Sequence, residues 1–325
     1  MRTGHIQGTH GGIELSKVIL GCGSFGSSIS RDLSFQMMDR YYEVEGRCFD
    51  TGRAYEGWIH NGASKSEYTL GKWIKSRGVR SNVKIITKGA HPEIRDMREN
   101  YRSRLSPDCL EYDMNTSLAV LDEEYVDVYF LHRDDEHIPV GEIMDVLDTF
   151  VKEGLTHAIG ASNWTVSRIL EANAYARKNH KTPFTVSQVM WNMAYMTKEK
   201  MFDPTCLFMS DSQYAQYLDA DIPVIAYSAQ AGGFFSKYLA AGRGVFEGRG
   251  NLFLNDVNIQ RANRVEQICQ KYNCSPAALS IAFVTNNKLP GYALIGNSSM
   301  KQMEDSITGF DLVIGQEDID YILGG

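Results

Sequence analysis

The sequence predicts a (β/α)8 barrel that uses the whole chain, residues 1–325, as one domain. Short apolar runs alternate with amphipathic helical patterns along the chain, which is the order of elements in α/β proteins with a parallel sheet. Polar residues follow the C-terminal ends of many of these runs, as they do at the mouth of such a barrel. The length agrees, because one barrel routinely takes about 250 residues or more.

The apolar runs are rich in Val, Ile, Phe or Tyr and are apolar on both faces, which is typical of strands buried on both sides of a parallel sheet. The predicted strands cover residues 18–23, 48–52, 84–88, 127–132, 157–162, 185–191, 223–228 and 292–297. Before the first strand, the pair Gly11-Gly12 indicates the turn of a small hairpin that closes the barrel floor.

The clearest helix covers residues 140–153, where apolar side chains recur at helical spacing, Pro139 precedes the helix and Gly154 follows it as a left-handed cap. Similar patterns predict helices over 33–44, 66–77, 108–122, 165–179, 211–219, 256–272, 275–286 and 300–307. Residues 229–255 are rich in Gly and Phe and have little periodicity, so we expect a long functional loop over the C-terminal face.

Composition limits the class of partner. Lys and Arg number 33 and Asp and Glu 40, a net charge of −7, which argues against binding to nucleic acid or to an anionic membrane. No apolar run approaches the roughly 18 residues of a membrane span or resembles a signal peptide. The six cysteines form no C-x-x-C pair. We therefore expect a cytoplasmic protein with no metal and a small-molecule substrate, of undetermined oligomeric state.

One motif near the N-terminus allows two interpretations. Gly21, Gly23 and Gly26 fit the pattern G-x-G-x-x-G after a strand, and Asp50 ends the next strand. The pattern alone would indicate a dinucleotide site of the Rossmann type. That fold requires a second domain, whereas the alternation of strands and helices never breaks. We therefore favour the other interpretation, in which these glycines turn the chain sharply and keep space open at the barrel mouth.

Four residues with complementary chemistry follow three successive predicted strands. Asp50 and Tyr55 lie at and just beyond the end of the second strand, Lys88 ends the third and His132 ends the fourth. Taken singly, each has an ordinary explanation as a turn cap, a solvated strand end or a structural histidine. In a barrel, however, these ends converge at one mouth.

Together these four groups suit the protonation of a carbonyl oxygen during hydride transfer. We expect Lys88 to lower the pKa of Tyr55 from about 10 and Asp50 to hold the ammonium of Lys88 in place. His132 would donate a hydrogen bond to the developing alkoxide, and Tyr55 would serve as general acid or base.

The chain resembles the aldo-keto reductase family, first in the segment Asp50-Thr51-Gly52-Arg53-Ala54-Tyr55 with Gly62, Ser66-Glu67 and Leu70-Gly71 after it. Further family motifs follow in order: Thr87-Lys88, Leu131-His132, Gly160-Ala161-Ser162-Asn163, Gln188 and Ala226-Tyr227-Ser228. The resemblance runs from about residue 15 to 310. It implies a barrel that binds a nicotinamide dinucleotide across its mouth, and it implies the same four roles for Asp50, Tyr55, Lys88 and His132.

The resemblance also implies cofactor contacts. Ser162, Asn163 and Gln188 would bind the nicotinamide carboxamide, and Tyr227 would stack on the nicotinamide ring. Backbone N–H groups of four residues would approach the pyrophosphate: Ser228, Ala229, Gln230 and Gly232. Ordinary strand-end hydrogen bonding and, for Tyr227, barrel packing are the alternatives.

At the adenosine end, Gly296 and Gln302 stand where family members that prefer NADPH often place Lys and Arg. Ser298 and Lys301 could still bind a phosphate group, whereas Asp305 favours a contact with adenine. The resemblance therefore implies a preference for NADP(H), with NAD(H) as the other candidate cofactor.

Aromatic residues at strand ends or in loops predict an apolar substrate pocket: Phe25, Trp58, Trp191 and Phe234. Arg133, followed by two aspartates, suggests a polar or sugar-like carbonyl compound, unless it only forms a solvated ion-pair loop. We expect an NAD(P)(H)-dependent oxidoreductase that interconverts an aldehyde or ketone and its alcohol. The alternative is a barrel that retains its cofactor as a redox sensor with little turnover.

Overall fold

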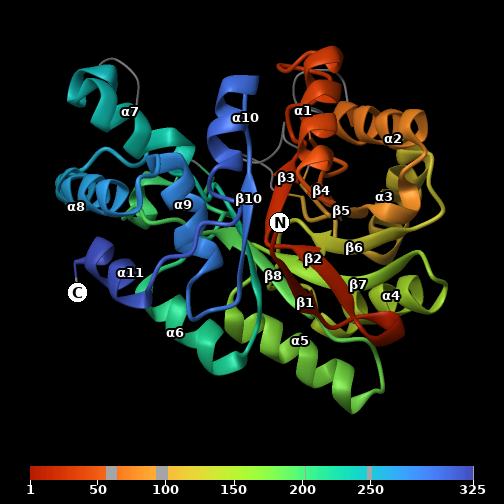
Figure 1. The fold of residues 1–325 in the computed structure, drawn as a ribbon. Helices are drawn as coiled ribbons and strands as arrows, with labels where there is room; N and C mark the ends of the chain where they lie inside the picture. The colour runs from red at the N-terminus through yellow and green to blue at the C-terminus, as the bar shows by residue number, and fades with distance from the viewer. Residues whose placement is uncertain (56–63, 93–101, 202, 247–250, 325) are drawn as a thin grey trace.

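A computed structural model describes residues 1–55, 64–92, 102–201, 203–246 and 251–324. Eight parallel strands close into a barrel in the spatial order β10-β3-β4-β5-β6-β7-β8-β9, and helices surround this barrel (Figure 1). The predicted (β/α)8 fold is therefore confirmed.

Each barrel strand overlaps a strand that the apolar runs predict. The strands are β3 (Val18–Gly21), β4 (Cys48–Asp50), β5 (Lys84–Gly89), β6 (Val126–Leu131), β7 (Thr156–Ser162), β8 (Val186–Met190), β9 (Val224–Tyr227) and β10 (Gly291–Ile295). All their neighbours in the barrel are parallel. Apolar side chains on both faces are thus explained, since one face packs inside the barrel and the other under the helices.

The predicted helices are also present. They are α1 (Arg31–Glu43), α2 (Lys65–Arg77), α3 (Pro107–Leu121), α4 (Val140–Lys152), α5 (Val166–Lys178), α6 (Asp211–Ala220), α8 (Asp256–Tyr272), α9 (Pro276–Thr285) and α10 (Met300–Ile307). Pro139 caps the start of α4, and Gly154 follows it with a φ of 75°. Helices α1 to α6 contact one another in chain order, and α10 contacts both α9 and α1, so the helices form an outer ring.

Two segments differ from the prediction. Residues 229–255 are not all loop, because they contain η5 (Ala231–Gly233), α7 (Phe234–Ala241) and η6 (Arg243–Phe246). The two-turn helix α7 is too short to show periodicity, and it is stabilised by contacts of Phe234 with Tyr238 and Phe246. A further helix, α11 (Gln316–Leu323), packs against α8 and was not predicted.

The expected N-terminal hairpin closes one end of the barrel. It consists of β1 (Thr3–Ile6) and β2 (Ile13–Ser16), joined through the short turn η1 (Thr9–Gly11). Gly12 has a φ of 107°, a conformation that favours glycine. Ile6, Ile13 and Leu15 pack in one cluster with side chains from inside the barrel, including Ile86 and Val128. The hairpin is therefore the floor, and the opposite end is the mouth.

Strand alternation decides which residues face the barrel interior. Cys48, Ile86 and Val186 belong to the interior cluster. Successive side chains of a strand point to opposite faces, so residues two positions further along face inward as well: Asp50 on β4, Lys88 on β5 and Gln188 on β8. The interior is thus apolar near the floor and polar at the mouth.

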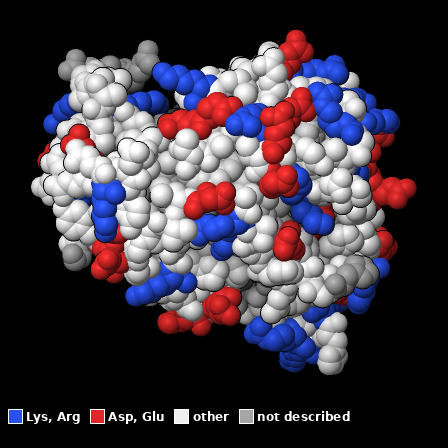
Figure 2. Space-filling model, in the orientation of Figure 1, with Lys and Arg blue, Asp and Glu red and all other residues white. Residues whose placement is uncertain are grey.

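The surface carries both signs of charge. Figure 2 shows Lys and Arg interspersed with Asp and Glu on the face presented there. Among the residues that the structure describes, no helix combines the length and the apolar character needed to cross a membrane.

Candidate active site

The structure brings Asp50, Tyr55, Lys88 and His132 together at the barrel mouth. The ammonium Nζ of Lys88 lies 2.5 Å from Oδ1 of Asp50 and 4.8 Å from the centre of the Tyr55 ring. The Tyr55 and His132 rings meet edge to face, with centroids 5.4 Å apart. Residues 82 positions apart in sequence (50 and 132) therefore share one site.

Lys88 and Asp50 form a fully buried ion pair. Lys88 is 0% and Asp50 1% exposed, and Lys88 also donates to the carbonyl oxygen of Thr51 at 2.8 Å. Burial acts to lower the pKa of Lys88, but the opposite charge of Asp50 and the contact with Tyr55 outweigh it and raise that pKa. Lys88 is therefore a fixed ammonium beside the phenol.

The pKa of the Tyr55 hydroxyl is raised above its ordinary value. Burial favours the neutral phenol more strongly than the charge and hydrogen bond of Lys88 favour the phenolate. The net lowering expected from the sequence is wrong, although Lys88 does act in the expected direction. At neutral pH the phenol keeps its proton and can donate it.

His132 is a neutral imidazole at neutral pH. Its pKa is lowered well below the ordinary value by burial first and then by His91, Arg133 and Lys88. A neutral ring carries one N–H, so His132 can donate one hydrogen bond to an oxygen beside Tyr55 without carrying charge.

The residues expected at the nicotinamide carboxamide gather at the same rim, where they bind one another. Nε2 of Gln188 donates to Oδ2 of Asp50 at 2.9 Å. Nδ2 of Asn163 donates to Oγ of Ser162, and Oδ1 of Asn163 accepts from the hydroxyl of Tyr227 at 2.9 Å. These amides and hydroxyls form a polar layer next to the Lys88–Asp50 pair.

An elongated cleft of about 760 Å³ leads outward from Asp50 and Tyr55 towards α10. Of the residues expected to bind cofactor, eight line it: Ser228, Ala229, Gln230, Gly232, Gly296, Ser298, Gln302 and Asp305. Lys301 lies on the first turn of α10 and is exposed. A Cβ atom built at Gly232 or Gly296 would meet no heavy atom within 4 Å, so there is open space beside both glycines.

The turn after β9 has the geometry of an anion-binding backbone. Ser228, Ala231, Gly232 and Gly233 all have positive φ, and successive N–H groups in such turns can converge on a phosphate. Nζ of Lys237 on α7 lies 2.8 Å from the carbonyl oxygen of Gly232, and Lys237 lines the cleft. Lys237 is not among the predicted cofactor residues, because its segment lacks helical periodicity and yet forms α7.

The α10 end of the cleft is organised by side chains that bind each other. Oε1 of Gln302 accepts from the backbone N–H of Ser298 at 2.8 Å and from its hydroxyl at 3.0 Å. Gln230 is braced against α10, since its Nε2 donates to Oγ of Ser306 at 2.9 Å. The cleft therefore spans from the phenol of Tyr55 to the start of α10.

The glycines of the G-x-G-x-x-G pattern have structural roles at the barrel mouth. Gly21 and Gly23 line the cleft beside Tyr55, and a closed parallel barrel excludes the Rossmann interpretation. Gly26 has a φ of 76°, and a Cβ there would lie 2.2 Å from Oγ1 of Thr69 on α2. Gly26 is thus required for the turn and for close packing.

The predicted aromatic pocket is not assembled as expected. Trp191 follows the last residue of β8 and packs on Tyr214 and Phe283. Phe25 is buried, and Phe234 of α7 packs against Phe246. Trp58 lies outside the described residues. None of the described three lines the cleft.

Arg133 is buried, and each nitrogen of its guanidinium donates at least one hydrogen bond. Its guanidinium binds Asp203 at 2.9 Å, Thr205 at 2.8 Å and the carbonyl oxygen of His132 at 2.8 Å. The alternative of a solvated pair with Asp134 is wrong, because Asp134 pairs with Arg168. Arg133 therefore fixes the loop after β8 against the His132 backbone and does not offer a free charge to a substrate.

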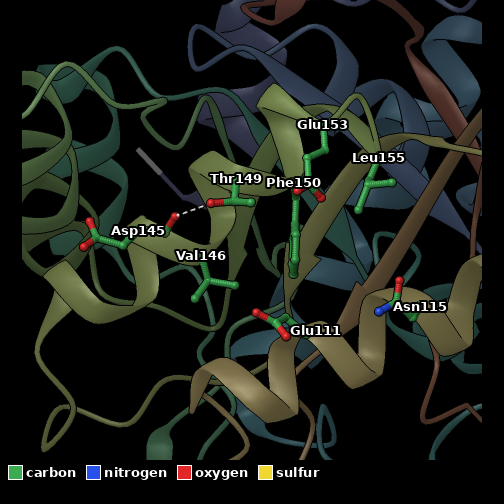
Figure 3. Close-up of a pocket in the computed structure, with 8 residues that line it drawn as sticks. All are labelled: Glu111, Asn115, Asp145, Val146, Thr149, Phe150, Glu153 and Leu155. Atoms are coloured by element: carbon green, nitrogen blue, oxygen red, sulfur yellow. Dashed lines mark hydrogen bonds between the residues drawn. The ribbon is translucent and has the colours of Figure 1, made fainter.

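A second hollow lies between α3 and α4, away from the mouth (Figure 3). It measures about 440 Å³ and is lined by Glu111, Asn115, Asp145, Val146, Thr149, Phe150, Glu153 and Leu155. Asp145 already binds Lys181 and Tyr175. No predicted site residue lines this hollow, and among the described residues no group of three or more His, Cys, Asp or Glu is placed to hold a metal ion.

A sequence model of the Aldo/keto reductase family matches residues 17–324. The chain belongs to the aldo/keto reductase family. Members of this family use a nicotinamide dinucleotide without a metal ion and act on small carbonyl compounds or alcohols.

Named relatives agree with this assignment. The chain is 24% identical over 330 residues to a putative aryl-alcohol dehydrogenase of Saccharomyces cerevisiae (96% of this chain, 83% of the relative). It is 24% identical over 333 residues to norsolorinic acid reductase of Aspergillus flavus (97% and 78%). It is 24% identical over 309 residues to an uncharacterized oxidoreductase of Bacillus subtilis (94% and 90%). This aldo/keto reductase is an oxidoreductase enzyme.

Proposed function

We propose that this aldo/keto reductase interconverts an aldehyde or ketone, including sugar-like ones, and the corresponding alcohol, with Tyr55 as general acid in reduction and general base in oxidation. The observation that carries the proposal is the contact between the protonated phenol of Tyr55 and the ammonium of Lys88 at the barrel end of the cleft. This ammonium is buried and is held by Asp50. This arrangement can hold a carbonyl oxygen and deliver a proton to it.

Each of the four residues at the rim has its own role in the proposed reaction. Asp50 and the carbonyl oxygen of Thr51 fix the ammonium of Lys88, and Lys88 stabilises the phenolate that Tyr55 becomes after it gives up its proton. The neutral ring of His132 donates its N–H to the same oxygen and orients the carbonyl. The buried setting strengthens each of these interactions, since few waters compete.

The cofactor proposed is NADP(H), with NAD(H) as the alternative. When bound, the nicotinamide supplies or accepts the hydride. There is open space beside Gly232 and Gly296, and the turn after β9 offers backbone N–H groups and Lys237 for the pyrophosphate. Ser298 and Lys301 stand at the start of α10, where they favour a 2′-phosphate. The residues present therefore fit an extended dinucleotide.

The carboxamide contacts are part of the same proposal. Ser162, Asn163 and Gln188 would exchange the hydrogen bonds that they now make with one another and with Asp50 for bonds to the carboxamide. Tyr227 would stack on the ring. The six cysteines are free thiols, as expected for a protein in the cytoplasm, which is the location we propose.

The test compares the wild type with Tyr55→Phe. Reduction of a panel of aldehydes, ketones and sugars is followed with NADPH and NADH, and the binding of each reduced cofactor is measured by fluorescence. We expect wild-type turnover, tighter binding of NADPH, and a loss of kcat of about 10²–10⁴-fold in the variant with unchanged cofactor affinity. Tight cofactor binding without turnover on the whole panel would instead support the redox-sensing barrel.

A further inference from the structure

A second histidine lies at the mouth and is not used by the proposed reaction. His91 follows β5, three residues after Lys88, and its ring meets the His132 ring edge to face at a centroid distance of 4.7 Å. Since His132 meets Tyr55 in the same way, the three rings form a continuous wall, with Tyr55 and His91 at its two ends.

The backbone conformation of Ala90 determines where His91 lies. Ala90 has a φ of 59°, in the left-handed region that residues other than glycine rarely adopt. This turn is stabilised by a hydrogen bond of 2.8 Å from the N–H of Ala90 to Oδ2 of Asp113. Strained backbone of this kind is concentrated at functional sites, and here it directs the chain after β5 so that His91 lies against His132.

The protonation state of His91 follows from its neighbours. Nδ1 lies 2.8 Å from the carbonyl oxygen of Pro92, and a carbonyl only accepts, so Nδ1 carries the hydrogen. Burial and the charge of Arg133 lower the pKa of His91 to about 4, so the ring is neutral at pH 7. Nε2 therefore holds an unshared electron pair and can only accept a hydrogen bond.

The surroundings of His91 do not favour a negatively charged group on the substrate. Arg133, whose charge acts on His91, is bound by Asp203, Thr205 and the His132 carbonyl oxygen. Among the described residues, Arg133 therefore offers no free charge to a carboxylate or phosphate placed beside the lone pair of Nε2. An O–H group is the complementary chemistry.

We propose that His91 is a specificity residue that accepts a hydrogen bond from a hydroxyl group on the carbon next to the reacting carbonyl. The preferred substrates are then α-hydroxy aldehydes and ketones, a class that includes sugars. This inference rests on the proposed function, because it places the carbonyl oxygen between Tyr55 and His132. Nε2 of His91 would then contact a substituent on the carbon next to the carbonyl. This substituent lies on the side of His132 that faces His91.

The test uses two ketones of nearly equal shape, hydroxyacetone and butanone, which differ by a hydroxyl in place of a methyl group. We expect the wild type to favour hydroxyacetone in kcat/KM. His91→Phe keeps a flat ring but has no acceptor. It should lower kcat/KM for hydroxyacetone by about tenfold, the value of a typical hydrogen bond, and leave butanone within about twofold. His91→Gln, which can present an acceptor oxygen, should recover most of the preference.

Two controls separate specificity from folding. His5→Phe changes a histidine on β1 at the barrel floor and should leave both ketones unaffected. Thermal unfolding and NADPH affinity of His91→Phe should match the wild type.

Equal kcat/KM for the two ketones in the wild type, or an equal loss on both in His91→Phe, would overturn the role of His91 while leaving Tyr55-dependent turnover in place. Absence of turnover on either ketone and on simple aldehydes would overturn the proposed function itself, and the role of His91 with it.

Discussion

The two ends of the cleft hold their polar groups in different ways. At the barrel end, Lys88 and Asp50 are buried and joined by a hydrogen bond of 2.5 Å, and they stand on strands. At the outer end, Ser298 and Gln302 bind each other on an exposed helix start, and Lys237 stands on a two-turn helix. The buried ion pair is thus held on rigid strands, whereas the groups at the outer end of the cleft stand on helix ends that loops position.

The largest expected effect comes from breaking the buried pair. Lys88→Met keeps the length of the side chain but leaves Asp50 as an uncompensated buried charge, so we expect a loss of about 3–5 kcal/mol in unfolding free energy and near-complete loss of carbonyl reduction. Denaturant unfolding and steady-state kinetics measure the two effects.

A matched control is Lys75→Met on α2, which breaks an exposed pair with Asp122 and should change neither stability nor activity measurably. If Lys88→Met were as stable and as active as Lys75→Met, the buried pair would have no role in either property.

A smaller effect is expected at the outer end. Lys237→Ala removes the one cationic side chain that lines the described part of the cleft, so the dissociation constant for NADPH should rise about tenfold, which corresponds to about 1.4 kcal/mol. Because Lys237 binds the turn after β9 at the carbonyl oxygen of Gly232 and not the Lys88–Asp50 pair, kcat at saturating cofactor should not change. Fluorescence titration and kinetics at saturating NADPH check the two expectations.

Lys178→Ala, on the last turn of α5, is the charge-matched control for Lys237→Ala. A loss in kcat equal to the loss in affinity would contradict the division of the cleft into a chemical end and a binding end.

The barrel end could be predicted because strand alternation is a strong constraint. Once β4, β5 and β8 are located, the inward parity of Asp50, Lys88 and Gln188 follows. The rule does not extend to Trp191, which lies just beyond the end of β8 and packs on Tyr214 and Phe283.

The loops could not be predicted in the same way. His91 reaches His132 only because Ala90 adopts a left-handed conformation and Asp113, from α3, stabilises it. α7 depends on contacts between Phe234, Tyr238 and Phe246 rather than on periodicity. The raised pKa of Tyr55 depends on how deeply the ring is buried, which motif spacing does not report.

The most direct test of the account is the pH dependence of kcat/KM for carbonyl reduction by the wild type with saturating NADPH. Tyr55, whose pKa is raised, keeps its proton at neutral pH, and His132, whose pKa is lowered, is already neutral there. We therefore expect a constant rate between pH 6 and 8 and a loss only at alkaline pH, where the phenol gives up its proton above the ordinary pKa range of a tyrosine. A rate that falls with rising pH around 6.5 would instead make protonated His132 the acid and contradict the account.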